Sequence, residues 1–146
     1  LNRIAPLVGV RESRRIEGIK TLTSDDVVHN ACHSDSVAVC AFPIDIHDPA
    51  GKELNWVRKE KDCCYDVPYG VMVPIKNLLA TGRCVSASHE ALASVRISAT
   101  AMALGQAAGT AAALCVGKDI DFADIDIQEL QGKLFEQGAV PGKKWL

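Results

Sequence analysis

His47 is a candidate for proton transfer because of the residues next to it in the sequence. It stands in Asp45-Ile46-His47-Asp48, with one carboxylate two positions before it and another directly after it. In a strand, residues 45 and 47 share one face, and a carboxylate beside an imidazole fixes its tautomer. Such a pair suits general acid–base catalysis, so we take His47 as a catalytic candidate. The alternative is a loop histidine bonded to the backbone.

Arg96 is a second candidate, because it is the last charged residue before a long uncharged segment. No Asp, Glu, Lys or Arg occurs from Ile97 to Val116. An arginine at the start of such a helix either faces solvent or is directed at an anion. The pair Arg14-Arg15 could also hold a carboxylate, although such pairs more often form a solvated strand face.

The cysteines offer metal and redox chemistry, but their spacing argues against both. A chain of this length folds without disulfides, so we expect free thiols, and no C-x-x-C pair is present. Adjacent cysteines such as Cys63 and Cys64 rarely both reach one tetrahedral zinc ion. We therefore predict no metal site, although suitable ligand types occur at Cys32, His33, Cys40, His47, Cys63 and Cys64.

Composition narrows the function classes further. The 146 residues are 48% apolar and 23% charged, as in an ordinary globular protein. A formal charge of −2 and an aromatic content of 5% argue against a nucleic-acid partner. The first twenty residues carry five basic side chains and no long apolar run, so no signal peptide is visible. We expect a cytoplasmic protein.

The elements that must position these residues are short in the first half of the chain. Thr23 and Asp26 have the spacing of a capping box and predict a helix over about 24–31. Apolar residues and turn residues predict strands at residues 5–20, 37–42 and 63–75. Another strand is predicted to start near Trp56.

The second half is predicted to be mainly helical. Residues 77–82 resemble a buried strand ending in Gly82, and a helix follows over about 95–116, with Gly117 as its C-cap. Half of residues 99–114 are alanine, which brings little transfer energy, so we expect a buried helix rather than a membrane span. Asp126 and Glu129 predict a last helix over about 127–137, ended by Gly138. The fold class is thus mixed α/β, an α+β arrangement with short antiparallel or mixed strands.

Residues 77–112 closely resemble the C-terminal part of FAD-dependent oxidoreductases. The similarity lies in the uncharacterised branch related to the fumarate reductase and succinate dehydrogenase flavoproteins. It is carried by NLLATGRCVS (77–86), SHEA (88–91), SVR (94–96) and ALGQAAGTAA (103–112). Upstream pieces stand in the order that branch shows: RRIEG (14–18), LTSDDV (22–27), IDIH (44–47) and VPY (67–69).

The resemblance implies FAD as cofactor and an unknown small-molecule substrate. Gly82 matches a position beside the ribityl chain, and Arg83 and Ser86 follow it in the same loop. The long helix would start with its amides directed at the flavin, so that Arg96, Ile97 and Ser98 become cofactor contacts. His89 lies just beyond this loop and joins His47 and Arg96 as a catalytic candidate.

The resemblance also divides the chain into parts. Residues 1–76 would belong to the substrate or cap region, 77–118 to the closing strand and helix of the FAD-binding domain, and 119–146 to a C-terminal helix and tail.

Two departures from the family pattern matter for function. Many relatives carry an acidic residue after the glycine, where this chain has Arg83. No G-x-G-x-x-G dinucleotide motif occurs, so we expect a C-terminal portion of a longer enzyme, inactive alone. The alternative is a non-catalytic module that associates through its alanine-rich helix, for example as a homodimer. A coding sequence upstream of Leu1 that contains the motif would favour the enzyme.

Overall fold

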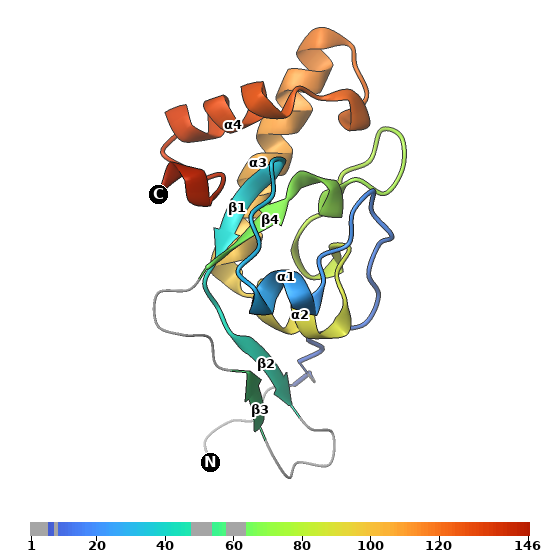
Figure 1. The fold of residues 1–146 in the computed structure, drawn as a ribbon. Coiled ribbons are helices and arrows are strands. Elements are labelled where there is room, and N and C mark those ends of the chain that lie inside the picture. The colour runs from blue at the N-terminus through green and yellow to red at the C-terminus, as the bar shows by residue number, and fades with distance from the viewer. Residues whose placement is uncertain (1–5, 8, 48–53, 58–63) are drawn as a thin grey trace.

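The computed structural model describes residues 6–7, 9–47, 54–57 and 64–146 (Figure 1). Two antiparallel strand pairs and the helices of this part give a mixed α/β fold, which confirms the predicted class. In chain order the elements are α1 (Ser24–Val28), β1 (Ser36–Cys40), β2 (Ile44–His47), β3 (Leu54–Val57), β4 (Tyr65–Pro68), α2 (His89–Val95), α3 (Ser98–Lys118) and α4 (Ile127–Glu136).

The core forms around the β1–β4 pair. All four residues of β4 are buried, and its Val67 pairs with Ala38 of β1. In Figure 1, α3 runs behind this pair, α4 lies across one end of α3, and the β2–β3 pair extends from the opposite end. The element α2 packs against both α1 and β2. This arrangement places β2 and α2 side by side, away from α4.

A buried polar network joins β4 to α2. The Ser94 hydroxyl donates to the Phe42 carbonyl at 2.5 Å, so the Tyr65 hydroxyl, 2.8 Å away, is the donor to Ser94. Burial is the main cause that raises the pKa of Tyr65 above its ordinary value. The neutral phenol therefore acts as a structural hydrogen-bond donor at the inner side of α2.

The C-terminal tail is fastened to the core by buried Asp66 of β4. Its carboxylate accepts hydrogen bonds from the His33 amide at 3.0 Å and the Lys143 amide at 2.7 Å. Beside it, the buried Gln131 side chain of α4 donates to the carbonyls of Ser34 and Ser36. Each contact crosses a long stretch of sequence, so the tail and α4 close the end of the β1–β4 pair.

Removing the Asp66 carboxylate should therefore destabilise the fold strongly. Asp66→Ala leaves two amide N–H groups without their acceptor in a site where the side chain is 3% exposed. We expect a loss of about 3 kcal/mol in the free energy of unfolding, measured by urea denaturation. Asp124→Ala, at an exposed aspartate, is the matched control and should cost less than about 0.5 kcal/mol. Equal losses in the two variants would contradict this role for Asp66.

Two predicted strands are wrong. Residues 6–7 and 9–20, the described part of 5–20, form no strand. Residues 9–20 lie along the core through single hydrogen bonds, such as Ile16 N–H to the Cys84 carbonyl. Residues 77–81 are irregular, with Asn77 at a φ of 56° and Leu78 45% exposed. Within the described residues, neither segment has a neighbouring strand to complete a ladder. The division of the chain at residues 77 and 119 stays a prediction.

The long helix differs from its prediction in three respects. It is preceded by a separate helix, α2, and Arg96 and Ile97 separate the two helices. Its end is Asp119, in the left-handed conformation at φ 55°, rather than Gly117. Only one side of α3 is buried, through residues spaced three or four apart: Thr100, Leu104, Ala107, Ala111 and Cys115.

The outer side of α3 is exposed, which contradicts burial on nearly all sides; Met102 and Val116 are 75% and 81% exposed. The prediction failed because alanine and glycine occur on both sides, so the sequence shows no contrast between them. By length and composition alone, α3 is the one helix of the described residues able to cross a membrane, a criterion that core helices also meet. The absence of a membrane span stays a prediction.

The caps of the shorter helices confirm the sequence pattern. Thr23 and Asp26 form the capping box of α1, whose end at Val28 is earlier than predicted. The Asp126 side chain accepts from the amides of Gln128 and Glu129 at the start of α4. Gly138, at a φ of 81°, follows the end of α4.

Candidate functional site

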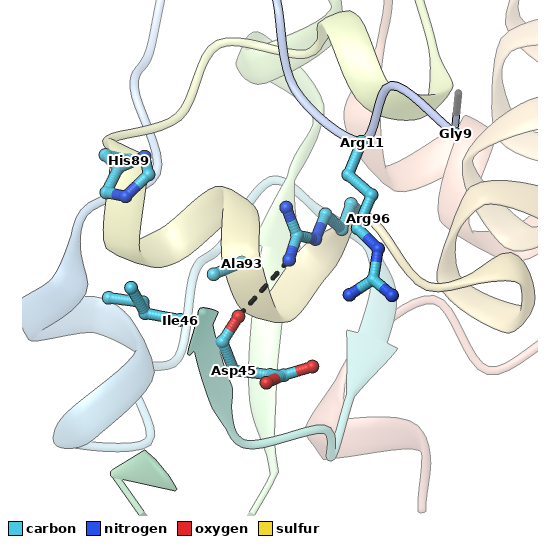
Figure 2. Close-up of a pocket in the computed structure, with 7 residues that line it drawn as sticks. All are labelled: Gly9, Arg11, Asp45, Ile46, His89, Ala93 and Arg96. Carbon is cyan, nitrogen blue, oxygen red and sulfur yellow. Dashed lines mark hydrogen bonds between the residues drawn. The ribbon is translucent and has the colours of Figure 1, made fainter. Parts of the chain in front are cut away.

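One face of α2 carries the chemistry of the site. The helix starts at His89, because the Ser88 side chain accepts the Ala91 amide, and it ends at the C-cap Arg96. His89, Ala93 and Arg96 are spaced by four and three residues and therefore lie on one side of the helix. Figure 2 shows His89 at one end of α2 and Arg96 at the other, with Ala93 between them.

This face borders a cavity of about 290 Å³, here called the α2 pocket, between α2, β2 and the N-terminal segment. The Arg96 side chain is 14% exposed, and its Nη2 donates to the Asp45 carbonyl at 3.2 Å. Ala93, 2% exposed, lines the cavity between His89 and Arg96. Figure 2 shows Arg11 reaching this space from the N-terminal segment beside Arg96. The described lining residues are Gly9, Arg11, Asp45, Ile46, His89, Ala93 and Arg96.

Glu12 connects the two ends of the α2 face. Its Oε1 atom lies 3.0 Å from His89 Nδ1 and 2.8 Å from Arg15 Nη1. Its Oε2 atom lies 4.0 Å from Arg96 Nη1. Sequence reasoning missed this residue, because 77 positions separate Glu12 from His89 and no local pattern links them. The sequence analysis predicted no helix over 89–95, although the Ser88 cap and the spacing of His89, Ala93 and Arg96 are a signal that could have found it.

A second cavity, here called the arginine pocket, adjoins the first. It has a volume of about 400 Å³ and shares Arg11 with the α2 pocket. The Arg83 guanidinium, in the 3-10 turn Gly82–Cys84, donates to the Val10 carbonyl and so joins this turn to the N-terminal segment. The lining residues are Val10, Arg11, Glu12, Ser13, Arg14, Arg83 and Cys84. Three arginines make this pocket suitable for an anionic ligand.

The other residues predicted for the flavin lie near this turn or at the start of α3. Gly82 adopts a φ of 80°, which requires glycine, and a side chain there would meet open space. Ile97 is the N-cap of α3 and Ser98 its exposed first residue; no side chain caps this end among the described residues. Ser86 is buried, with its hydroxyl 2.9 Å from that of Thr21.

The described residues do not place His47 in the α2 pocket. It is the last residue of β2 and pairs with Leu54, and its side chain lies outside the described residues. Its catalytic role stays a prediction. His89, Arg96 and Arg83 therefore come together with the N-terminal segment, whereas Ser86 serves the packing beneath the pockets.

Metal and disulfide chemistry receive no support from the described part of the chain. No group of three or more His, Cys, Asp and Glu side chains there is placed to hold a metal ion. Cys63 is outside this part, and the free cysteines within it are Cys32, Cys40, Cys64, Cys84 and Cys115.

Comparison with known proteins identifies a family. The family model described as FAD dependent oxidoreductase matches residues 1–134. No curated protein and no solved structure matches significantly. The matched range includes both pockets and all residues that line them.

Proposed function

The chain belongs to the FAD dependent oxidoreductase family, and from this premise we propose that it contributes one wall of the flavin site and part of the substrate site. The arginine pocket would receive the cofactor and the α2 pocket the substrate. The observation that carries this proposal is that the two pockets meet at Arg11. A redox enzyme needs that adjacency, because substrate and cofactor must lie in contact for hydride transfer.

The residues present fit an anionic cofactor. Arg83 and Arg14 line the arginine pocket, and the open space beside Gly82 leaves its backbone approachable. At the start of α3, the amides near Ile97 and Ser98 have no capping side chain in the described structure, so they suit negative charge. FAD, when bound, supplies hydride chemistry at its ring system. We assign the contacts with it to Gly82, Arg83, Arg96, Ile97 and Ser98.

The chain's own residues have separable tasks in this scheme. Arg96, fixed on the Asp45 carbonyl, presents positive charge to the substrate or to charge that develops on the flavin. His89, at the other end of the same face, accepts or donates the proton that accompanies hydride transfer. Within this proposal the nucleotide half of FAD is bound by a preceding dinucleotide-binding segment, which the missing G-x-G-x-x-G motif supports.

Variants in the two pockets should separate cofactor binding from substrate binding. In the product of the complete gene, Arg83→Ala should weaken FAD binding by about tenfold or more, as expected for one charge-assisted hydrogen bond. Ala93→Leu should retain FAD and raise KM, because the added side chain fills the α2 pocket. Flavin absorbance after gel filtration measures the first effect and steady-state kinetics the second. Loss of flavin in Ala93→Leu but not in Arg83→Ala would contradict the assignment.

A second candidate function is association through the outer side of α3. The exposure of Met102 and Val116 on an uncharged helix favours it. A concentration-dependent dimer of the 146-residue chain, broken by Met102→Glu, would support a module that binds a second copy. A monomer at all concentrations would leave the enzyme as the sole candidate.

A further inference from the structure

We propose that Glu12 is a positioning residue, which fixes His89 in the tautomer with the proton on Nδ1 and leaves Nε2 as an acceptor in the α2 pocket. Only the use of Nε2 as a base depends on the proposed function. The tautomer itself follows from contacts within this chain. His89 was a candidate from the resemblance, but nothing in the sequence indicated which of its ring nitrogens is available.

The first step concerns hydrogen-bond chemistry. An ionised carboxylate accepts hydrogen bonds and donates none. The distance of 3.0 Å between Glu12 Oε1 and His89 Nδ1 therefore requires a proton on Nδ1. In the neutral ring, Nε2 then carries the lone pair. Free histidine prefers the opposite tautomer, so an unoriented His89 would mainly present an N–H at Nε2.

The second step concerns why Glu12 stays in place. Arg15 Nη1 donates to the same Oε1 atom at 2.8 Å, and Arg96 Nη1 stands 4.0 Å from Oε2. The Glu12 side chain is 19% exposed, against 56% for His89. Two guanidinium groups thus hold a mostly buried carboxylate, which in turn orients a more exposed imidazole. The carboxylate is the fixed partner of this pair.

The third step concerns the charges around His89. Glu12 and Arg15 face it from the N-terminal segment, and Glu90 is its neighbour on α2. Hydrogen bonds from its own backbone amide and from Ser88 lower the pKa of Glu90, so this second carboxylate is ionised as well. Glu12 makes the hydrogen bond to the ring, and no contact between Glu90 and the ring nitrogens is recorded within the described residues.

The consequence is a base with a defined direction. His89 lines the α2 pocket, and its Nδ1 is occupied by Glu12. Nε2 is the nitrogen left to meet a ligand, and as a lone-pair acceptor it can take a proton from a hydroxyl or carbon acid. Glu12 acts through His89 and does not itself need to touch the substrate.

The experiment reads the tautomer directly and needs neither FAD nor a substrate. The 146-residue chain is labelled with ¹⁵N at histidine, and long-range proton–nitrogen NMR spectra are recorded at alkaline pH, where imidazoles are neutral. His89→Gln identifies the His89 signals. We expect the Nδ1–H pattern in the wild-type chain and a change to mainly Nε2–H in Glu12→Ala.

The matched control is Glu17→Ala, an exposed glutamate of the same segment, which should keep the wild-type pattern. A wild-type His89 with its proton on Nε2 overturns the proposal, and so does a Glu12→Ala variant that keeps the Nδ1–H pattern. If Glu12→Ala does not fold, the wild-type spectrum alone decides. Failure of FAD binding in the enzyme would leave these spectra unchanged, so the two proposals fail separately.

Discussion

Replacing Arg96 by leucine should lower kcat/KM of the complete gene product by about 100-fold or more, the range seen when one preorganised electrostatic donor is removed. Arg96 is the guanidinium at the junction of α2 and α3, 14% exposed and fixed on the Asp45 carbonyl. A fixed cation in a partly closed pocket interacts strongly with charge that develops during reaction, because it need not reorganise. The measurement is the rate at which flavin absorbance is lost with a substrate that bleaches the wild-type enzyme.

Two further variants separate charge from geometry and from general electrostatics. Arg96→Lys keeps the charge but loses the planar guanidinium, which reaches both the Asp45 carbonyl and the Glu12 carboxylate. We therefore expect a loss of kcat/KM between those of the wild type and Arg96→Leu. Lys133→Leu removes a positive charge on α4, distant from the α2 pocket, and should leave kcat/KM within about twofold. An Arg96→Leu enzyme that is folded, holds flavin and turns over at the wild-type rate would remove Arg96 from the site.

The predictions that held are those that depend on a few neighbouring residues. Thr23 with Asp26, and Asp126 with the amides after it, define helix starts through contacts within one turn. The continuous apolar run over residues 37–42 also predicted β1, which spans Ser36–Cys40 and is buried at four of its five residues. For these two helix starts the local pattern was sufficient, because the hydrogen-bonding partners are close in sequence.

The predictions that failed needed partners distant in sequence. Residues 77–82 have strand-like apolar character, yet no strand in the described part of the chain pairs with them. The Ala80 amide bonds instead to the Met72 carbonyl. The long helix was predicted from about residue 95, close to the observed start of α3 at Ser98, but the separate helix α2 over His89–Val95 was not predicted. The helical spacing within α2 is what turns His89 and Arg96 toward one pocket.

The site itself was recovered in part. His89 and Arg83 came from the family resemblance, and Arg96 also from its place before the uncharged segment. The structure brings all three around the N-terminal segment. Glu12 and Arg11 were missed, because their relevance depends on where that segment lies against α2. No periodicity encodes this placement, since the segment forms neither helix nor strand. Its position is set by tertiary contacts, among them a close backbone approach at Gly18.

Gly18→Ala should therefore be among the most harmful single changes in the chain, despite adding one methyl group. A Cβ at position 18 would lie 2.6 Å from the Gly70 carbonyl oxygen and 3.0 Å from the Ser86 Cβ. Both are held in place, and the amides of Ile19 and Lys20 bond to the Val73 and Gly70 carbonyls at 2.9 and 3.2 Å. Moving the segment outward would weaken these bonds, at a cost of about 3 kcal/mol in the free energy of unfolding.

The control for Gly18→Ala is the same substitution where space is open. A Cβ at Gly105 meets nothing within 4 Å on the exposed side of α3, so Gly105→Ala should stabilise the chain by about 0.5–1 kcal/mol. Urea unfolding of both variants measures these changes, and a Gly18→Ala protein as stable as the wild type would contradict the close approach.

The segment that Gly18 fastens also carries Arg11 and Glu12 to the pockets. For that reason Gly18→Ala should return His89 toward its Nε2–H tautomer even under conditions where most molecules remain folded, whereas Gly105→Ala should not.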